Sequence, residues 1–161
     1  MLPLKPRSPY DERGGLTIRP SSFARSKVRG LSQHTGQTAR MHELSIAQSL
    51  IELVEETAAQ AGAARVKTLT IQIGALAGVV KESLWFSFEL AAEGTCCAGA
   101  KLQINVIPVS IFCDRCEQAS QLNDVYVQIC PRCGMPAAKI LTGLELDLVS
   151  LELEPHATAH S

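Results

Sequence analysis

Four of the six cysteines lie in two tight turns near the end of the chain, and these turns constrain the fold more than any other feature. The turns are Cys113-Asp-Arg-Cys116 and Cys130-Pro-Arg-Cys133, with 13 residues between them. Two intervening residues let both sulfurs of a turn reach one ion at about 2.3 Å, and two turns complete a tetrahedral site. The spacing favours structural Zn²⁺ over an Fe–S centre. Two disulfides, or four unrelated thiols, are the alternatives.

Four thiolate ligands close the coordination sphere of zinc and leave no position for water or substrate. The site is therefore expected to be structural. The segment around it has few aromatic residues and is too short to build a core without help. We expect the metal to supply most of the folding free energy of a small zinc ribbon.

Charge is distributed unevenly along the 161 residues. Residues 1–40 contain eight Lys and Arg against Asp11 and Glu12, whereas residues 41–161 contain seven Lys and Arg against fourteen Asp and Glu. A body this acidic argues against nucleic acid as the main partner, because phosphate binding needs a basic face. No apolar run reaches the roughly 18 residues that a membrane span needs.

The first 40 residues are rich in proline, serine and glycine and show no apolar periodicity. This composition is typical of a disordered extension, and its Arg-rich, acid-poor character also fits an organelle transit peptide. The abrupt change in composition favours a third interpretation, in which translation starts at Met41. Because no secretory signal is present, we expect the cysteines to remain in the reducing cytoplasm.

Periodicity predicts two helices. The first begins after Met41, and its apolar spacing of three and four residues predicts a buried face. That face comprises Leu44, Ala47, Ile51, Val54 and Ala58. The second is expected over about 81–93, with a buried set of Leu84, Phe88 and Ala91 and with Trp85 beside them.

Alternation with period two predicts three strands. Their apolar positions are Leu69, Ile71 and Ile73 in the first, Leu102, Ile104 and Val106 in the second, and Leu144, Leu146 and Leu148 in the third. The third strand then changes phase, so that Val149, Leu151 and Leu153 become the apolar set. A change of phase predicts a β-bulge or a strand that passes between sheet faces.

This order predicts an α+β fold in which two helices cover a three-stranded sheet and a zinc ribbon is inserted. The expected divisions are a disordered extension or mis-assigned start at 1–40, an α+β domain at 41–108 plus 143–154, the zinc ribbon at 109–142, and a tail at 155–161.

No catalytic motif is present. The sequence has no glycine-rich phosphate loop and no nucleophile elbow. Cys96 and Cys97 are adjacent and follow Gly94, and we expect them to pack as small apolar residues at the start of a strand. The protein is therefore not expected to be an enzyme.

His42 is a candidate metal ligand because of its place in the chain. If Met41 is the first residue, its amine, the His42 amide nitrogen and the imidazole Nδ1 can form fused chelate rings. A planar, all-nitrogen arrangement suits Ni(II) or Cu(II). Glu43 adds a carboxylate that can ligate or orient. The alternative is an exposed helix start where Glu43 favours the helix dipole and His42 lies in solvent.

Several motifs together resemble the HypA/HybF family of hydrogenase-maturation nickel metallochaperones. They are Met41-His-Glu-Leu-Ser-Ile-Ala47, Ile73-Gly-Ala-Leu-Ala-Gly-Val79, Glu93-Gly-Thr95 and the paired cysteine turns. The resemblance runs from Met41 to about Glu154. It implies a nickel ligand at His42 and structural zinc at Cys113, Cys116, Cys130 and Cys133. It also implies docking with the GTPase HypB and delivery of Ni(II) to the large subunit of [NiFe] hydrogenase.

Two other functions remain open from the residues alone. One is a zinc-ribbon interaction module that does not use nickel, and the other is a thiol redox switch built from the Cys-x-x-Cys pairs. The oligomeric state is also open between a monomer and a homodimer.

Overall fold

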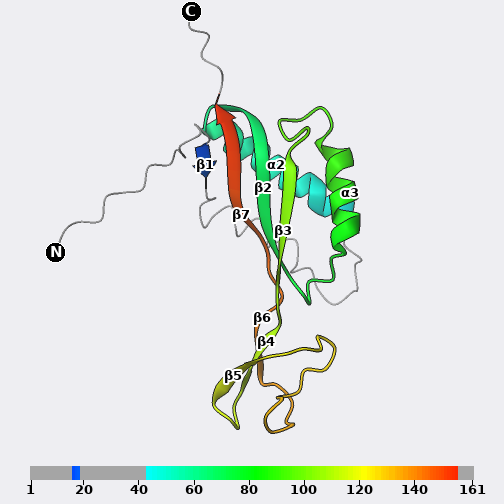
Figure 1. Ribbon diagram of the computed structural model, residues 1–161, viewed down its shortest axis with the longest axis vertical. Coiled ribbons are helices and arrows are strands. Elements are labelled where there is room, and N and C mark those ends of the chain that lie inside the picture. Colours follow the sequence, from blue (N-terminus) through cyan, green and yellow to red (C-terminus); the bar gives the residue numbers. More distant parts are fainter. Residues whose placement is uncertain (1–15, 19–42, 156–161) are drawn as a thin grey trace, which may run out of the picture.

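The computed structural model describes residues 16–18 and 43–155, which form two parts joined end to end (Figure 1). The larger part contains β1 (Leu16–Ile18), α2 (Glu43–Gln60), β2 (Ala63–Gly74), α3 (Lys81–Ala92), β3 (Lys101–Ile107) and β7 (Leu146–Pro155). The smaller part, residues 109–142, is called the cysteine lobe and contains β4 (Ser110–Cys113), β5 (Gln118–Gln121) and β6 (Lys139–Thr142). Among the described helices, none is long and apolar enough to cross a membrane.

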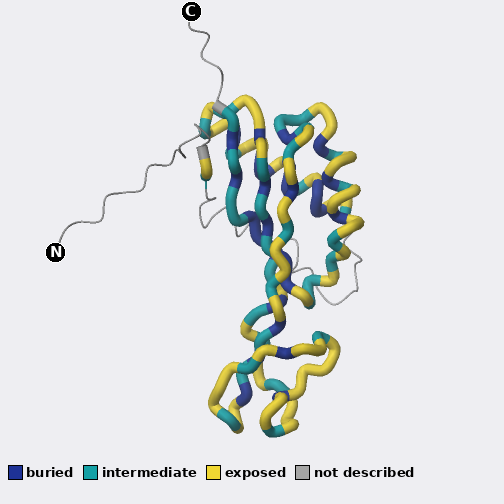
Figure 2. The backbone as a smooth tube through the Cα atoms, in the orientation of Figure 1, coloured by how far each residue is buried: buried dark blue, intermediate teal, exposed yellow. Residues whose placement is uncertain are grey.

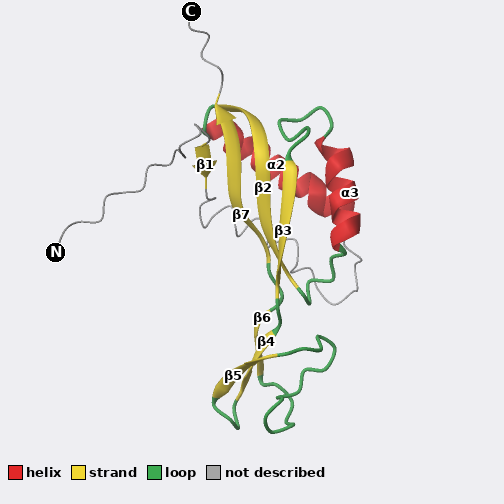
Figure 3. Cartoon of the chain, viewed as in Figure 1, coloured by secondary structure: helices red, strands yellow, loops and turns green. Residues whose placement is uncertain are grey.

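The main sheet has the strand order β1-β7-β2-β3. Strand β2 pairs in parallel with β3 and antiparallel with β7. Helix α2 crosses one face of this sheet, and α3 packs beside α2 near β3 (Figure 3). The α+β class with an inserted lobe is therefore confirmed. The sheet has four strands instead of three because Leu16–Ile18 adds a strand at the edge of β7, in a segment where no regular structure was predicted.

The core lies between the helices and the main sheet, as the burial pattern in Figure 2 shows. The three predicted apolar residues of β2 are all buried there, which confirms that strand. The predicted face of α2 needs correction: Leu44 is 39% exposed, whereas Ile46 and Leu50 are fully buried. The helix contacts both the sheet and α3, so its buried surface is wider than one stripe.

Two further predicted core positions are exposed. Val106 lies near the end of β3, where the strand leaves the helices and approaches the cysteine lobe, and Leu144 precedes β7. In α3, which ends one residue earlier than predicted, Leu84 and Phe88 are buried. Trp85 stays at the surface and its Nε1–H donates to the carbonyl oxygen of Leu102 at 3.0 Å, which ties α3 to β3.

The predicted bulge is present in β7. Thr70 of β2 pairs with Ser150, but the next residue, Ile71, pairs with Leu148, so Val149 is the extra residue. Leu148 and Leu151 are consequently both fully buried on the same side although two residues separate them. The bulge explains why the apolar phase changes at this point in the sequence.

The two parts meet where the backbone passes very close to itself. A Cβ atom added at Gly74 would lie 2.1 Å from the carbonyl carbon of Gly143, so no side chain fits there. The Leu76 N–H donates to the Gly143 carbonyl oxygen at 2.7 Å, and the Leu76 side chain packs against the core of the cysteine lobe. The loop after β2 therefore holds the lobe against the end of the main sheet.

Candidate metal centre

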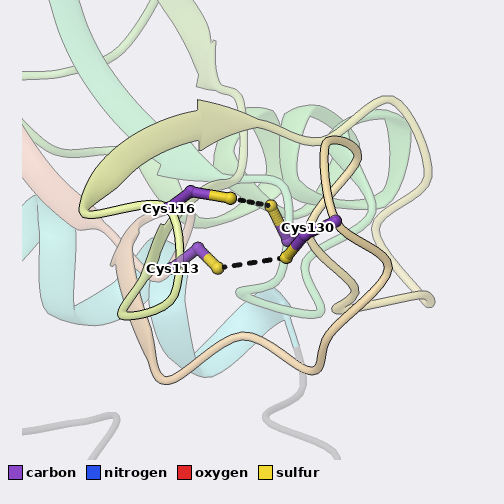
Figure 4. Close-up of side chains that lie close together, drawn as sticks. Cys113, Cys116 and Cys130 are labelled. Atoms are coloured by element: carbon purple, nitrogen blue, oxygen red, sulfur yellow. Dashed lines mark hydrogen bonds between the residues drawn. The ribbon is translucent and has the colours of Figure 1, made fainter.

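The four predicted cysteines come together in the cysteine lobe. Cys113 ends β4, Cys116 follows in the turn to β5, and the other pair lies in a second turn before β6. Their sulfur atoms all lie within 4.8 Å of one another, with 3.6 Å between Cys113 and Cys133 and 4.0 Å between Cys116 and Cys130. Figure 4 shows Cys113 and Cys116 directed from one turn toward the cysteines of the other, with Cys116 facing Cys130.

These separations fit one tetrahedral ion. Ligand sulfurs at about 2.3 Å from a tetrahedral zinc lie about 3.8 Å apart. A disulfide would bring two sulfurs to about 2.05 Å, and all four cysteines are free thiols. The disulfide alternative is therefore not observed in the structure.

Both turns contain a residue with the same unusual backbone conformation. The residue directly after each second cysteine adopts a left-handed conformation, with φ of 50° at Glu117 and 72° at Gly134. This conformation folds the chain back so that both sulfurs of a turn face the same point. Gly134 carries the usual sequence signal for it, whereas Glu117 gives none, because non-glycine residues seldom adopt positive φ.

The surroundings of the sulfurs favour a bound cation. The N–H groups of Cys133 and Arg132 hold the pKa of the Cys130 thiol down at about 7. By contrast, contact with the Cys133 thiol raises the pKa of Cys116 to about 12. Crowded thiolates repel one another, so the four groups can ionise together only when a cation shares them.

The lobe has little other core. Its buried residues are Val109, Ile111, Cys113, Leu122 and Cys130, so two of the five are cysteines of the cluster. So few apolar groups cannot offset the conformational entropy of some thirty ordered residues. The structure thus agrees with a lobe that depends on its metal for folding.

The other predicted ligand, His42, lies outside the described residues, as does Met41. The adjacent Glu43 is described, and its Oε1 accepts a hydrogen bond of 3.3 Å from the Val80 N–H at the start of α3. A carboxylate is favourable there because the first N–H groups of a helix lack partners within the helix. The contact joins residues 37 positions apart, and no local sequence pattern predicts it.

Cys96 and Cys97 are not part of the cluster. They lie in the turn between α3 and β3, where Cys97 is fully buried, and their sulfurs are 4.0 Å apart. Burial raises the pKa of both thiols, that of Cys97 to about 12. These are properties of packed, unreactive thiols.

Cys97 is accordingly expected to resist alkylation in the folded protein. At pH 8, raising a thiol pKa from 9.0 to about 12 lowers the thiolate fraction by about a thousandfold, and only the thiolate reacts. Iodoacetamide labelling at pH 8, followed by peptide mass mapping, will measure the rate at Cys97 against the same residue in denaturant. A native rate within tenfold of the denatured one contradicts the expectation.

The fold and the cluster together define an α+β protein with four cysteines placed so that they could hold a structural metal ion. Comparison with known proteins identifies the family within this class. The family model for HypA, described as "Hydrogenase/urease nickel incorporation, metallochaperone, hypA", matches residues 41–153. The chain belongs to the HypA family, whose members are maturation factors and not enzymes.

Relatives of known name align with this chain over nearly their whole lengths. The hydrogenase maturation factor HypA of Roseiflexus sp. is 46% identical over 122 residues, which is 74% of this chain and 99% of the relative. The factor of the same name from Chloroflexus aurantiacus is 47% identical over 112 residues, 70% of this chain and 98% of the relative. The solution structure of the Ni metallochaperone HypA from Helicobacter pylori is 29% identical with a TM-score of 0.53, covering 71% of this chain and 99% of that one.

Proposed function

We propose that this protein binds Ni(II) and delivers it to the large subunit during [NiFe] hydrogenase maturation. The observation that carries the proposal is the match of residues 41–153 to the HypA family model, with the Met41-His-Glu motif at its start. The family description names nickel incorporation, and a solved relative is named a Ni metallochaperone.

The two metals are assigned to two different sites. The cysteine cluster supplies four soft sulfur donors at tetrahedral spacing and suits structural Zn(II). A closed thiolate site holds its ion too firmly for transfer. His42 is the proposed nickel ligand because its imidazole and nearby backbone nitrogens can form an open site from which an ion can be released.

Transfer also needs partners. The proposed ones are the GTPase HypB, which docks with the protein, and the hydrogenase large subunit, which receives the nickel. A cytoplasmic location belongs to the same proposal, because cluster cysteines must stay reduced to bind zinc. We further propose that the α+β part and residues 109–142 act as separate domains, one for nickel and one for zinc.

Substitution of His42 by alanine tests the nickel assignment. The wild-type chain is expected to hold one zinc and take up one exchangeable nickel, and His42→Ala is expected to keep the zinc and lose the nickel. Native mass spectrometry before and after addition of Ni(II) measures both stoichiometries. Glu52→Gln, at an exposed position further along α2, is the matched control and is expected to keep both metals.

Two results would count against the proposal. Full nickel uptake by His42→Ala would remove that residue from the site. A wild-type protein that holds zinc and takes up no nickel would leave an interaction module built on the zinc ribbon as the better description.

A further inference from the structure

Strand β1 occupies the edge of the main sheet although it lies outside the family match, which begins at residue 41. Its residues pair antiparallel with β7, in the register Leu16 to Leu153, Thr17 to Glu152 and Ile18 to Leu151. The Ile18 side chain is half-buried and packs against the main core, whereas Thr17 is exposed. The short strand is therefore held by its backbone and by a side-chain anchor.

The partner strand has the properties of an acceptor. β7 is ten residues long, and without β1 it would be the edge of the sheet, with unpaired N–H and C=O groups facing outward. Leu151 and Leu153 are fully buried on the helix side. An added strand therefore gains backbone hydrogen bonds and can place an apolar side chain beside an existing core.

We propose that the edge of β7 at Leu151–Leu153 is a strand-addition site whose ligand is an extended apolar–polar–apolar segment of another protein. The chain's own Leu16-Thr17-Ile18 shows which segment fits, since it has this pattern and is seated at the site. The contact covers only three paired residues, and the tether in the same chain raises its occupancy by raising the effective concentration of the strand. A partner segment that pairs over more of β7 would displace it.

The first experiment uses the chain that starts at Met41, which spans nearly the whole length of the solved relatives and so has the extent of a complete folded unit. A synthetic peptide of residues 12–22 is titrated into this ¹⁵N-labelled chain. We expect saturable amide shifts centred on Leu151–Leu153. A peptide carrying Ile18→Asp is the matched control and is expected to produce at least tenfold weaker binding, because a carboxylate cannot replace the half-buried apolar side chain of Ile18.

The full-length chain supplies the competition test. The wild type is expected to show no peptide shifts at Leu151–Leu153, because β1 already occupies the site. Ile18→Asp in the full-length chain should restore them, whereas Thr17→Ala, which changes an exposed side chain, should not.

Three outcomes overturn the proposal. One is the absence of shifts in the chain that starts at Met41, and another is equal binding by that chain and the full-length wild type. The third is a concentration-dependent shift at Leu151–Leu153 without peptide, which would assign the edge to a second copy of the chain. Nickel uptake plays no part in these readouts.

Discussion

Replacing Cys113 by serine is expected to abolish zinc binding and unfold the cysteine lobe while the main sheet stays folded. Structural zinc sites supply about 10–16 kcal/mol of apparent binding free energy, and the lobe has only five buried residues, one of which is Cys113 itself. Zinc content is measured by native mass spectrometry. The amide spectrum is expected to lose its dispersion for residues 109–142 and retain it for β2 and β7.

Cys96→Ser is the control for this substitution, because it removes a thiol that is separate from the cluster. It should retain one zinc and a dispersed lobe spectrum. A Cys113→Ser protein that kept its zinc at wild-type affinity would show that the cluster does not hold the ion as a set of four.

Gly74→Ala is expected to destabilise the protein by about 3 kcal/mol or more, since overpacking against backbone atoms cannot be relieved by side-chain rotation. The new Cβ would lie 2.1 Å from the carbonyl carbon and oxygen of Gly143 and 2.4 Å from the Leu144 nitrogen. The junction between the two parts must therefore open. A fall in Tm of about 10 °C is expected in calorimetry.

Gly62→Ala separates this steric effect from the general cost of replacing a glycine. Gly62 has a φ of 65° and no atom within 4 Å of an added Cβ, so strain in the left-handed backbone alone should cost about 1 kcal/mol. Equal destabilisation by the two variants would mean that the junction has room for a methyl group.

The features that could be predicted correctly are those that depend on the spacing of residue types within a few consecutive positions. The spacing of the two cysteine turns predicted that their four sulfurs converge, and the change of apolar phase around Val149 predicted the bulge, because each pattern follows from the geometry of a few consecutive residues. The strand pattern at Leu69 and Ile71 succeeded for the same reason.

The features that were missed depend on contacts between distant segments. Leu44 fits the apolar spacing of α2 but lies at the exposed start of the helix, and Ile46 is buried because α2 has two neighbours. The approach of Gly74 to Gly143 joins residues far apart in the chain. Strand β1 was also missed, since three residues are too few to produce a periodic signal.

The way the cysteine lobe is attached limits how a bound partner can be oriented. Two chain segments cross the junction side by side, from β3 to β4 and from β6 to β7, and the loop after β2 is pinned between the parts by Leu76. Twisting the lobe would require the Leu76 contacts to break. The same short loop ends at Val80, which contacts Glu43. A rotation of the lobe by a bound protein would therefore be transmitted through this loop to the first residues of α2 and α3. The junction would also fix the orientation of the bound protein relative to the main sheet.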